Sequence, residues 1–149
     1  GAAVAIERWL RSSGGFVYDE RPPRSRALPP LADFEQRTKS GYCQHFAGTM
    51  ALMLRYLGIP ARVAVGFSSG TWKDDGWPVT DHDAHAWVEV FIPGHGWIGL
   101  DPTHNRQTDN TYVKLAVGRD YADVPPVTGH YRGTLQRSLK VEVQVMRLA

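Results

Sequence analysis

Cys43 is the residue whose chemistry stands out first, because it is the only cysteine in the 149 residues. It follows Gly41 and Tyr42 and opens a run whose apolar residues recur at helical spacing. Backbone N–H groups at a helix N-terminus carry partial positive charge, which favours a thiolate and can hold a developing oxyanion. Cys43 is therefore a candidate nucleophile, although a lone cysteine is more often a small buried apolar side chain.

Two further residues, His85 and Asp101, have the chemistry that a nucleophilic cysteine needs. His85 stands in the alternating segment 84–92, which is typical of a β-strand, and it would take up the thiol proton or stabilise the thiolate as a cation. Asp101 ends the next strand pattern, and a carboxylate beside the imidazole would orient the ring and stabilise its charged form. The turn Pro-Gly-His-Gly between the two segments predicts an antiparallel hairpin.

The register of this hairpin decides whether His85 and Asp101 can meet. Centring the turn on Gly94 and His95 gives partner numbers that sum to about 189, which places His85 opposite position 104. Asp101 then comes within diagonal reach of His85 only through a bulge or a wider loop. A purely structural reading also stays open, with His85 as a hydrogen-bonded strand histidine and Asp101 as a cap of the Pro-Thr turn.

The elements that would position these residues follow from the apolar pattern. Residues 43–57 predict a helix with a buried stripe, which Gly58 ends. The members of the stripe are Phe46, Ala47, Met50, Ala51, Leu54 and Leu57. Shorter helices are expected over residues 4–10 and 31–40, and strands over residues 61–67, 84–92, 97–101, 112–118 and 135–148. Helices before strands predict an α+β domain in which the central helix covers an antiparallel sheet.

Together these motifs resemble the transglutaminase-like superfamily, a branch of the papain-like cysteine enzymes. The resemblance rests on Gly41-x-Cys43 at a helix start, GIPARVAVGF after it, HAWVEV, GWIGLDPT and the tail AVGRDYADVPPVTGHYRG, which is similar to bacterial and archaeal members. It implies a papain/transglutaminase-like α+β core, in which the helix that begins at the cysteine packs on an antiparallel sheet. It also implies that Cys43 is the nucleophile, that His85 is the general base and acid, and that Asp101 orients His85.

The same resemblance implies an oxyanion hole at the start of the central helix. The backbone N–H of Cys43 would supply part of it. Tyr18, from an upstream segment, and the side chain of Gln44 are two candidates for a second donor. His45 lies two residues after Cys43, about 200° around the helix, and is expected to point away from the site.

The substrate cleft is expected to involve the long polar segment 68–83, since loops of this length in compact domains are often functional. Its residues Trp72 and Trp77 either contact the substrate or hold the segment against the core. His82 is expected to line the cleft beside His85. Trp87 is expected there as well, packing around the site rather than reacting, and Trp97 is expected to pack in the same way.

The expected reaction is acyl transfer, in which the Cys43 thiolate attacks an amide carbonyl and forms a thioester. Water as the acceptor makes a peptidase or amidase, and a lysine amine makes a cross-linking protein-glutamine γ-glutamyltransferase. The bacterial character of the resemblance favours hydrolysis of peptide or protein amides. A non-catalytic peptide-binding module is a further alternative, against which the full set of cysteine, histidine and aspartate argues.

Charge and composition exclude several other classes of function. The net charge is only +2 and no basic stripe is present, so nucleic acid is not an expected partner. No cofactor is expected. Three neighbouring residues are of types that bind metals, namely His82, Asp83 and His85, but no CxxC or HExxH motif accompanies them. A calcium site needs more acidic ligands than Asp74 and Asp75 supply. We therefore expect no metal site.

Length and cysteine content bound the context of the chain. Residues 1–149 suit one domain. Because the chain opens without methionine, an excised part of a larger protein is an open alternative. No apolar run is long enough to span a bilayer, so no direct membrane insertion is expected, and no signal-peptide pattern is present. A lone free cysteine favours a cytoplasmic location, and the alternative is an extracytoplasmic domain of a membrane-anchored protein.

Overall fold

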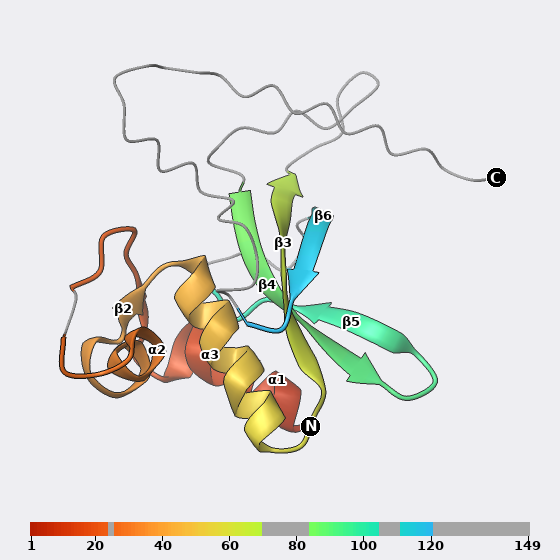
Figure 1. Ribbon diagram of the computed structural model, residues 1–149, viewed down its shortest axis with the longest axis horizontal. Helices are drawn as coiled ribbons and strands as arrows, with labels where there is room; N and C mark the ends of the chain where they lie inside the picture. Colours follow the sequence, from red (N-terminus) through yellow and green to blue (C-terminus); the bar gives the residue numbers. More distant parts are fainter. Residues whose placement is uncertain (24–25, 70–83, 105–110, 121–149) are drawn as a thin grey trace.

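A computed structural model describes residues 1–23, 26–69, 84–104 and 111–120 of the chain (Figure 1). Two short π-helical segments, η1 and η2, continue the first two α-helices. The elements are α1 (Ala2–Arg8), η1 (Trp9–Ser13), β1 (Val17–Tyr18), α2 (Pro30–Asp33), η2 (Phe34–Thr38), β2 (Ser40–Gly41), α3 (Cys43–Tyr56), β3 (Ala61–Ser69), β4 (Ala84–Ile92), β5 (Gly96–Leu100) and β6 (Thr111–Gly118). Apart from the two-residue strands β1 and β2, the helices precede the strands, and the predicted α+β class is confirmed.

The main sheet has four antiparallel strands in the order β5-β4-β3-β6. A small parallel pair, β1 and β2, lies on the other side of α3 (Figure 1). All four strands of the main sheet were predicted from their alternating or branched apolar residues, with ends that differ by one or two positions. The predicted strand over residues 135–148 lies outside the described residues.

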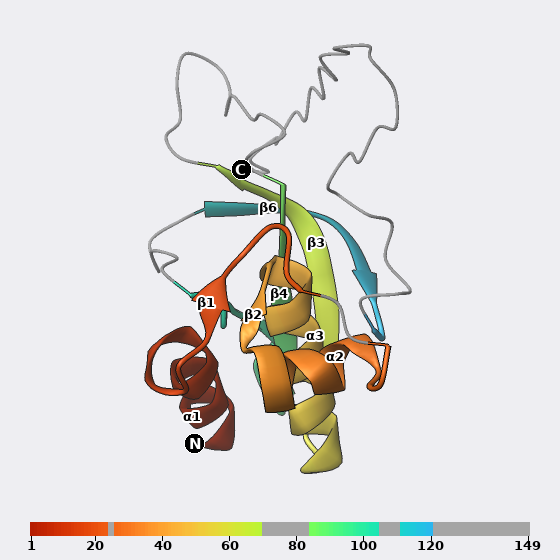
Figure 2. The same ribbon diagram turned by 90° about the vertical axis from the view of Figure 1, so that its left-hand side faces the viewer.

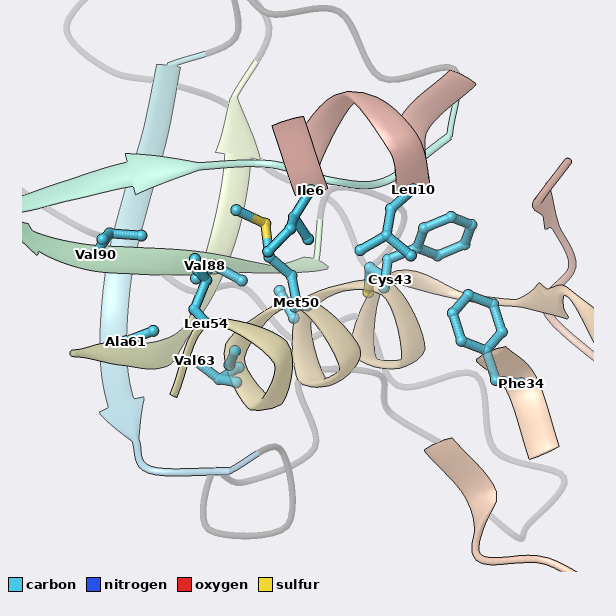
Figure 3. Close-up of a cluster of buried hydrophobic side chains, with 14 of the residues drawn as sticks. Ile6, Leu10, Phe34, Cys43, Met50, Leu54, Ala61, Val63, Val88 and Val90 are labelled. Carbon is cyan, nitrogen blue, oxygen red and sulfur yellow. The ribbon is translucent and has the colours of Figure 1, made fainter. Parts of the chain in front are cut away.

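The core forms where α3 packs on β3 and β4 (Figures 1 and 3). Five of the six predicted stripe residues of α3 are buried, namely Phe46, Ala47, Met50, Ala51 and Leu54. The sixth, Leu57, was wrongly predicted, since it is 56% exposed. The helix ends at Tyr56, and the chain turns away through Leu57 and Gly58, whose φ of 78° favours glycine.

The first helix packs against the opposite end of the same core. Ile6 and Leu10 extend from α1 and η1 toward α3 (Figure 3). An aromatic group continues this packing, with ring centroids of Phe16 and Phe34 5.0 Å apart and those of Phe34 and Phe46 also 5.0 Å apart. Both α1 and α2 contact α3, and Figure 2 shows α1 to the left of α3 and α2 in front of it.

The C-terminal end of α3 is tied to the end of β6. The Arg55 guanidinium donates to the backbone carbonyls of Ala61 and Arg119 and pairs with the Asp120 carboxylate. These contacts link the helix to the outermost strand of the sheet. Among the described residues, no helix is both long and apolar enough to cross a membrane.

Candidate active site

Cys43 is the first residue of α3, as the sequence predicted. Its side chain is 4% exposed and lies at the edge of the core, next to the end of the helix (Figure 3). At this position the backbone N–H of Cys43 has no partner within the helix, because the first N–H groups of an α-helix lack acceptors there. The thiol therefore sits beside free donors and the positive end of the helix dipole.

Gly41 and His45 shape the turn that leads into the helix. Nδ1 of His45 accepts a hydrogen bond from the Tyr42 N–H at 3.2 Å, so His45 caps the helix and its ring packs at 5.5 Å from Phe34. The expectation that His45 points away from the site is consistent with these contacts. A Cβ at Gly41 would lie 2.8 Å from the His45 side chain and 2.9 Å from Phe34. Glycine is therefore required where the chain enters the helix.

His85 lies near the start of β4 and is 1% exposed. Its Nε2 is 2.7 Å from Oδ2 of Asp101, and both side chains are buried. The ring is thus fixed by a carboxylate that follows the neighbouring strand β5. The two residues are brought together as the sequence suggested.

The route by which His85 and Asp101 meet differs from the one expected. In the β4–β5 hairpin, Val88 pairs with Leu100 and Ile92 pairs with Gly96. The two residue numbers of each pair therefore sum to one less than the predicted value of 189. Extending this register places His85 opposite position 103, two residues from Asp101. Side chains two positions apart on a strand share a face, so Asp101 reaches His85 diagonally without a bulge in this hairpin.

The Asp101 carboxylate is held at both oxygens. Oδ2 interacts with His85 and also accepts the hydroxyl hydrogen of Tyr112 at 2.6 Å. Oδ1 accepts the backbone N–H of Thr103 at 3.0 Å. The predicted alternative, in which Asp101 caps the turn after it, is therefore present together with the contact to His85.

The backbone of Asp101 is held by the first helical segment. Its N–H donates to Oε2 of Glu7 at 3.0 Å, and its carbonyl accepts from the Arg11 guanidinium. Glu7 and Arg11 also form an ion pair with an N–O distance of 3.8 Å. Burial raises the pKa of Glu7, and the charge of Arg11 and the bond from Asp101 act in the opposite direction. These contacts fix the position from which Asp101 reaches His85.

The electrostatics of the pair favour an imidazolium beside a carboxylate. Burial by itself lowers the pKa of His85, but the hydrogen bond to Asp101 and the interactions with Cys43 raise it, to about 9. Burial raises the pKa of Asp101, but the His85 hydrogen bond and charge, the Tyr112 hydroxyl and the Thr103 N–H lower it to about 2. At neutral pH His85 is therefore protonated and Asp101 ionised.

Cys43 also acts on the His85 imidazole, because its side chain is among the groups that raise the pKa of His85. Within the described part of the chain, Nδ1 of His85 is buried and has no partner in hydrogen-bond geometry. Nε2 faces Asp101, so Nδ1 is the nitrogen left to exchange a proton with Cys43 or with a bound substrate.

Tyr18 and Gln44 both lie near the start of α3. Tyr18 is paired with Gly41 in the parallel β1–β2 ladder, two residues before Cys43. Gln44 lines a pocket of about 520 Å³ together with Tyr42 and His45. The pocket is further bounded by Glu20, Arg21, Pro22, Pro23, Pro30, Leu31, Asp33, Phe34, Thr38 and Ser40. The residues directly before and after Cys43, Tyr42 and Gln44, thus both line this pocket.

The four predicted cleft residues have different outcomes. Trp87 is buried beside His85, with ring centroids 6.4 Å apart, and Gly99 lies against its indole. Trp72, Trp77 and His82 lie outside the described residues. Trp97, by contrast, is remote from His85 and packs on the guanidinium of Arg62 at 3.9 Å, so the expectation that it packs around the site is wrong. Its pairing with Phe91 places it at the far end of the hairpin.

Sequence reasoning missed Tyr112, Glu7 and Arg11. Glu7 and Arg11 are four residues apart on a helix, a spacing that predicts an ion pair but does not reveal contact with Asp101. Tyr112 lies in a predicted strand, and no motif marked it. Within the described ranges, no three histidine, cysteine, aspartate or glutamate side chains are grouped as metal ligands.

Comparisons with known proteins show which family and which solved structures this chain is similar to. The family model described as the transglutaminase-like superfamily matches residues 1–102. A protein-glutamine gamma-glutamyltransferase from Pseudomonas aeruginosa is 41% identical over 125 residues, which cover 79% of this chain and 19% of that protein. An uncharacterized protein from Mycobacterium leprae is 32% identical over 148 residues, which cover 99% of this chain and 50% of that protein.

Two solved structures share the fold. The periplasmic domain of TgpA from Pseudomonas aeruginosa superimposes with a TM-score of 0.59 at 39% identity, covering 67% of this chain and 35% of that one. A candidate cysteine protease from Cytophaga hutchinsonii superimposes with a TM-score of 0.59 at 29% identity, covering 81% of this chain and 37% of that one. The chain thus spans half or less of the length of these relatives.

Proposed function

Because the chain belongs to the transglutaminase-like superfamily of cysteine-dependent enzymes, we propose that it transfers acyl groups from carboxamides through a thioester at Cys43. The observation that carries the proposal is the buried His85–Asp101 pair, 2.7 Å apart, together with Cys43, whose side chain is among the groups that raise the pKa of His85. In this proposal Cys43 is the nucleophile, His85 is the general acid and base, and Asp101 orients and charges His85.

The first half of the reaction forms the thioester. A protonated His85 beside Cys43 favours the thiolate, whose Sγ attacks the carbonyl carbon of the carboxamide. The carbonyl oxygen becomes an oxyanion, which the Cys43 N–H at the helix start stabilises. The C–N bond then breaks, Nδ1 of His85 gives its proton to the departing nitrogen, and an amine or ammonia leaves.

The second half of the reaction releases the acyl group. An acceptor gives a proton to Nδ1 of His85 and attacks the thioester carbon. The C–S bond breaks, and Cys43 leaves as the thiolate beside the restored imidazolium. A primary amine as acceptor yields a new amide, and water yields a carboxylic acid.

We propose a glutamine carboxamide as the acyl donor and a primary amine as the acceptor. The supporting observation is the 41% identity to a relative named protein-glutamine gamma-glutamyltransferase. Hydrolysis of peptide or protein amides, the reaction favoured by the sequence, is the second candidate. The likeness to a candidate cysteine protease supports it, because the same thioester serves both reactions.

One assay separates these reactions. The protein is incubated with a glutamine-containing peptide and a fluorescent primary amine, and the products are identified by mass spectrometry. Transamidation attaches the amine and releases ammonia, deamidation converts glutamine to glutamate, and peptidase activity shortens the peptide. Cys43→Ser is expected to abolish every product while leaving the fold intact.

The contrary result would be equally clear. If the wild-type chain forms no thioester with the peptide but binds it as tightly as Cys43→Ser does, the chain is a peptide-binding module. If Cys43→Ser unfolds instead, Cys43 is a structural residue and the proposed mechanism fails.

Three further assignments belong to the same proposal. Tyr18 and Gln44 are the proposed sources of a second oxyanion donor, and their positions next to the start of α3 support this role. Segment 68–83, with Trp72, Trp77 and His82, is proposed to contact the substrate. Residues 1–149 are proposed to form one domain, which the buried core cluster shared by the described helices and strands supports.

We further propose that the chain acts outside the cytoplasm as one domain of a longer protein. The periplasmic location of the similar TgpA domain and the partial coverage of the relatives support this proposal. Protease treatment of intact cells with a permeabilised outer layer tests it. Digestion of the domain in such cells is expected, and protection until the inner membrane is lysed would contradict it.

A further inference from the structure

We propose that Tyr112 is a positioning residue of this site, which holds the Asp101 carboxylate through its hydroxyl and thereby limits how tightly His85 keeps its proton. The proposal rests on the proposed function, because it concerns the proton transfers of the same site. It adds a residue that the family motifs in this sequence do not mark. Four observations carry it.

The hydroxyl of Tyr112 and the ring of His85 share one oxygen. Oδ2 of Asp101 is 2.6 Å from the Tyr112 hydroxyl and 2.7 Å from Nε2 of His85. The other oxygen is held by the Thr103 N–H at 3.0 Å. A carboxylate with a donor at Oδ1 and two donors at Oδ2 cannot rotate without losing a bond, so Tyr112 helps to fix the direction from which Asp101 meets His85.

The ring of Tyr112 stacks on the same group. Its centroid is 4.9 Å from that of Trp87 and 5.9 Å from that of His85, with interplanar angles of 24° and 18°. The rings of His85 and Trp87 are themselves nearly parallel, at 22°. Tyr112 therefore makes both a polar and an aromatic contact with the His85–Asp101 pair.

A register shift in the sheet brings Tyr112 to this face. Between β3 and β6, Val65 pairs with Ala116, but the next residue, Gly66, pairs with Lys114. The skipped residue is a β-bulge, and it reverses which side chains of β6 lie on each face. Tyr112 consequently pairs with Ser68 and lies on the face of His85, where an unbroken register would pair it with position 69.

The residue of β3 that pairs with His85 is a glycine. Gly66 of β3 pairs with His85 of β4 on one side and with Lys114 of β6 on the other. Because glycine lacks a Cβ, the rings of His85 and Tyr112 can approach each other across β3. The bulge and Gly66 thus occur together at the one point of the sheet where this approach is needed.

The chemical consequence concerns the basicity of His85. The Tyr112 hydroxyl compensates part of the Asp101 charge. Burial raises the pKa of Asp101, and the Tyr112 hydroxyl is one of the groups that lower that pKa. Without that hydroxyl the carboxylate would attract the His85 proton more strongly. A more basic His85 is a weaker proton donor to the departing amine, which slows the first half of the reaction.

Other titratable or charged side chains lie near His85 and Asp101 or next to Tyr112 in the described residues. Cys43, the first residue of α3, is among the groups that raise the pKa of His85. Glu7 and Arg11, from the first helical segment, contact the backbone of Asp101. Lys114, the next residue on the same face of β6, is paired with Glu89 at 2.8 Å. In the described residues, Tyr112 is thus the hydroxyl that touches the carboxylate.

The experiment follows the rate of Cys43 alkylation by iodoacetate against pH, without any substrate. Iodoacetate is an anion, so it reacts fast with the thiolate only while the positively charged, protonated His85 lies beside it. The fall of the alkylation rate at alkaline pH, called the alkaline limb of the profile, therefore reports the loss of the His85 proton. The wild-type limb is expected near pH 9. In Tyr112→Phe the ring stays and the hydroxyl is lost, so the limb is expected to move up by about half a pH unit or more.

Tyr56→Phe is the matched control, because it removes a hydroxyl from a tyrosine that is 92% exposed on α3. Its alkylation profile and melting temperature are expected to match the wild type. In the acyl-transfer assay, Tyr112→Phe is expected to lower kcat by up to about threefold for each half unit of that shift, with KM unchanged, since it alters proton transfer and not binding.

Several results would overturn the inference. A Tyr112→Phe profile that coincides with the wild type, even with a lower melting temperature, would leave Tyr112 a structural residue. A shift in Tyr112→Ala without one in Tyr112→Phe would assign the effect to ring stacking and reject a role for the hydroxyl. A wild-type profile identical to that of His85→Ala would instead reject the proposed function itself, which keeps the two failures apart.

Discussion

His85 and Asp101 hold opposite charges in a buried setting, so the pH dependence of folding should report on their contact. The pKa of His85 is raised to about 9, above its ordinary value of 6.5. Its contribution to stability is therefore complete below pH 6.5 and is lost as the pH rises through 9. The pKa of Asp101 is lowered from 3.8 to about 2, so its contribution is present above pH 3.8 and is lost as the pH falls toward 2.

Asp101→Asn tests this linkage. The variant keeps the shape of the side chain but leaves His85 without a counter-charge, and it is expected to lose about 3 kcal/mol of folding free energy. The loss should be largest between pH 4 and 6.5 and should shrink as the pH rises through about 9. Urea unfolding of both proteins at pH 5.5, 7 and 9.5 measures it, and a difference that stays constant with pH would contradict the assigned charges.

For single residues, the sequence predicted those whose reactive side chain stands at a helix start, in an alternating strand or at a strand end. Cys43 begins a helix after a glycine, His85 stands in an alternating strand, and Asp101 ends the next strand. Tyr112 was not predictable, because its contact depends on a β-bulge that shifts the register of β6 by one residue. An alternating pattern fixes the period of a strand but not which face meets the neighbouring strand.

Among the elements, α3 shows how far an apolar stripe extends. Its stripe was predicted to include both Leu54 and Leu57. Leu54 is fully buried against the sheet, whereas Leu57 lies beyond the last helical residue and is largely exposed. The periodicity was correct, but the helix ends at the residue before Leu57 because the chain turns at Gly58.

The pair of substitutions Leu54→Ala and Leu57→Ala measures this difference. Leu54→Ala removes a buried side chain and leaves a cavity, so it is expected to cost about 2–5 kcal/mol of folding free energy. Leu57→Ala removes the same atoms from an exposed position and is expected to stay within about 0.5 kcal/mol. Equal losses in denaturant unfolding would mean that Leu57 is packed in solution.

The β4–β5 hairpin shows a second limit at this scale. The turn was located correctly, but the register was not: the residue numbers of paired residues sum to one less than predicted. That difference decides whether Asp101 shares a face with His85. Gly94 and Gly96 both have positive φ, so the turn uses a backbone shape that a count of residues does not specify.

For the whole molecule, the contacts of Glu7 and Arg11 make the first helical segment part of the site. Both side chains hold the backbone of Asp101. The helix itself was predictable from its apolar spacing, and its burial of Ile6 and Leu10 follows from that spacing. The contact with Asp101 was not predictable, because it joins residues that only tertiary packing brings together.

Glu7→Ala tests this connection. It leaves the Asp101 N–H without its acceptor, which is expected to cost about 1–3 kcal/mol of folding free energy and to lower acyl transfer. Glu7→Gln keeps an oxygen at the same place and is expected to restore most of both. Glu35→Ala, the same change in η2, should stay within about 0.5 kcal/mol in the same urea unfolding assay. A Glu7→Ala variant with wild-type stability and activity would show that the contact is dispensable.

The separation of these residues along the chain has a consequence during synthesis. Glu7 and Asp101 are 94 positions apart, and Cys43 emerges from the ribosome long before His85, Asp101 and Tyr112. A growing chain therefore carries a thiol that lacks its imidazolium, and the proposed reactivity arises only once the sheet has closed on the first helix. A molecule that later unfolds loses that reactivity in the same event, so neither a nascent nor a damaged copy would form acyl bonds with its neighbours.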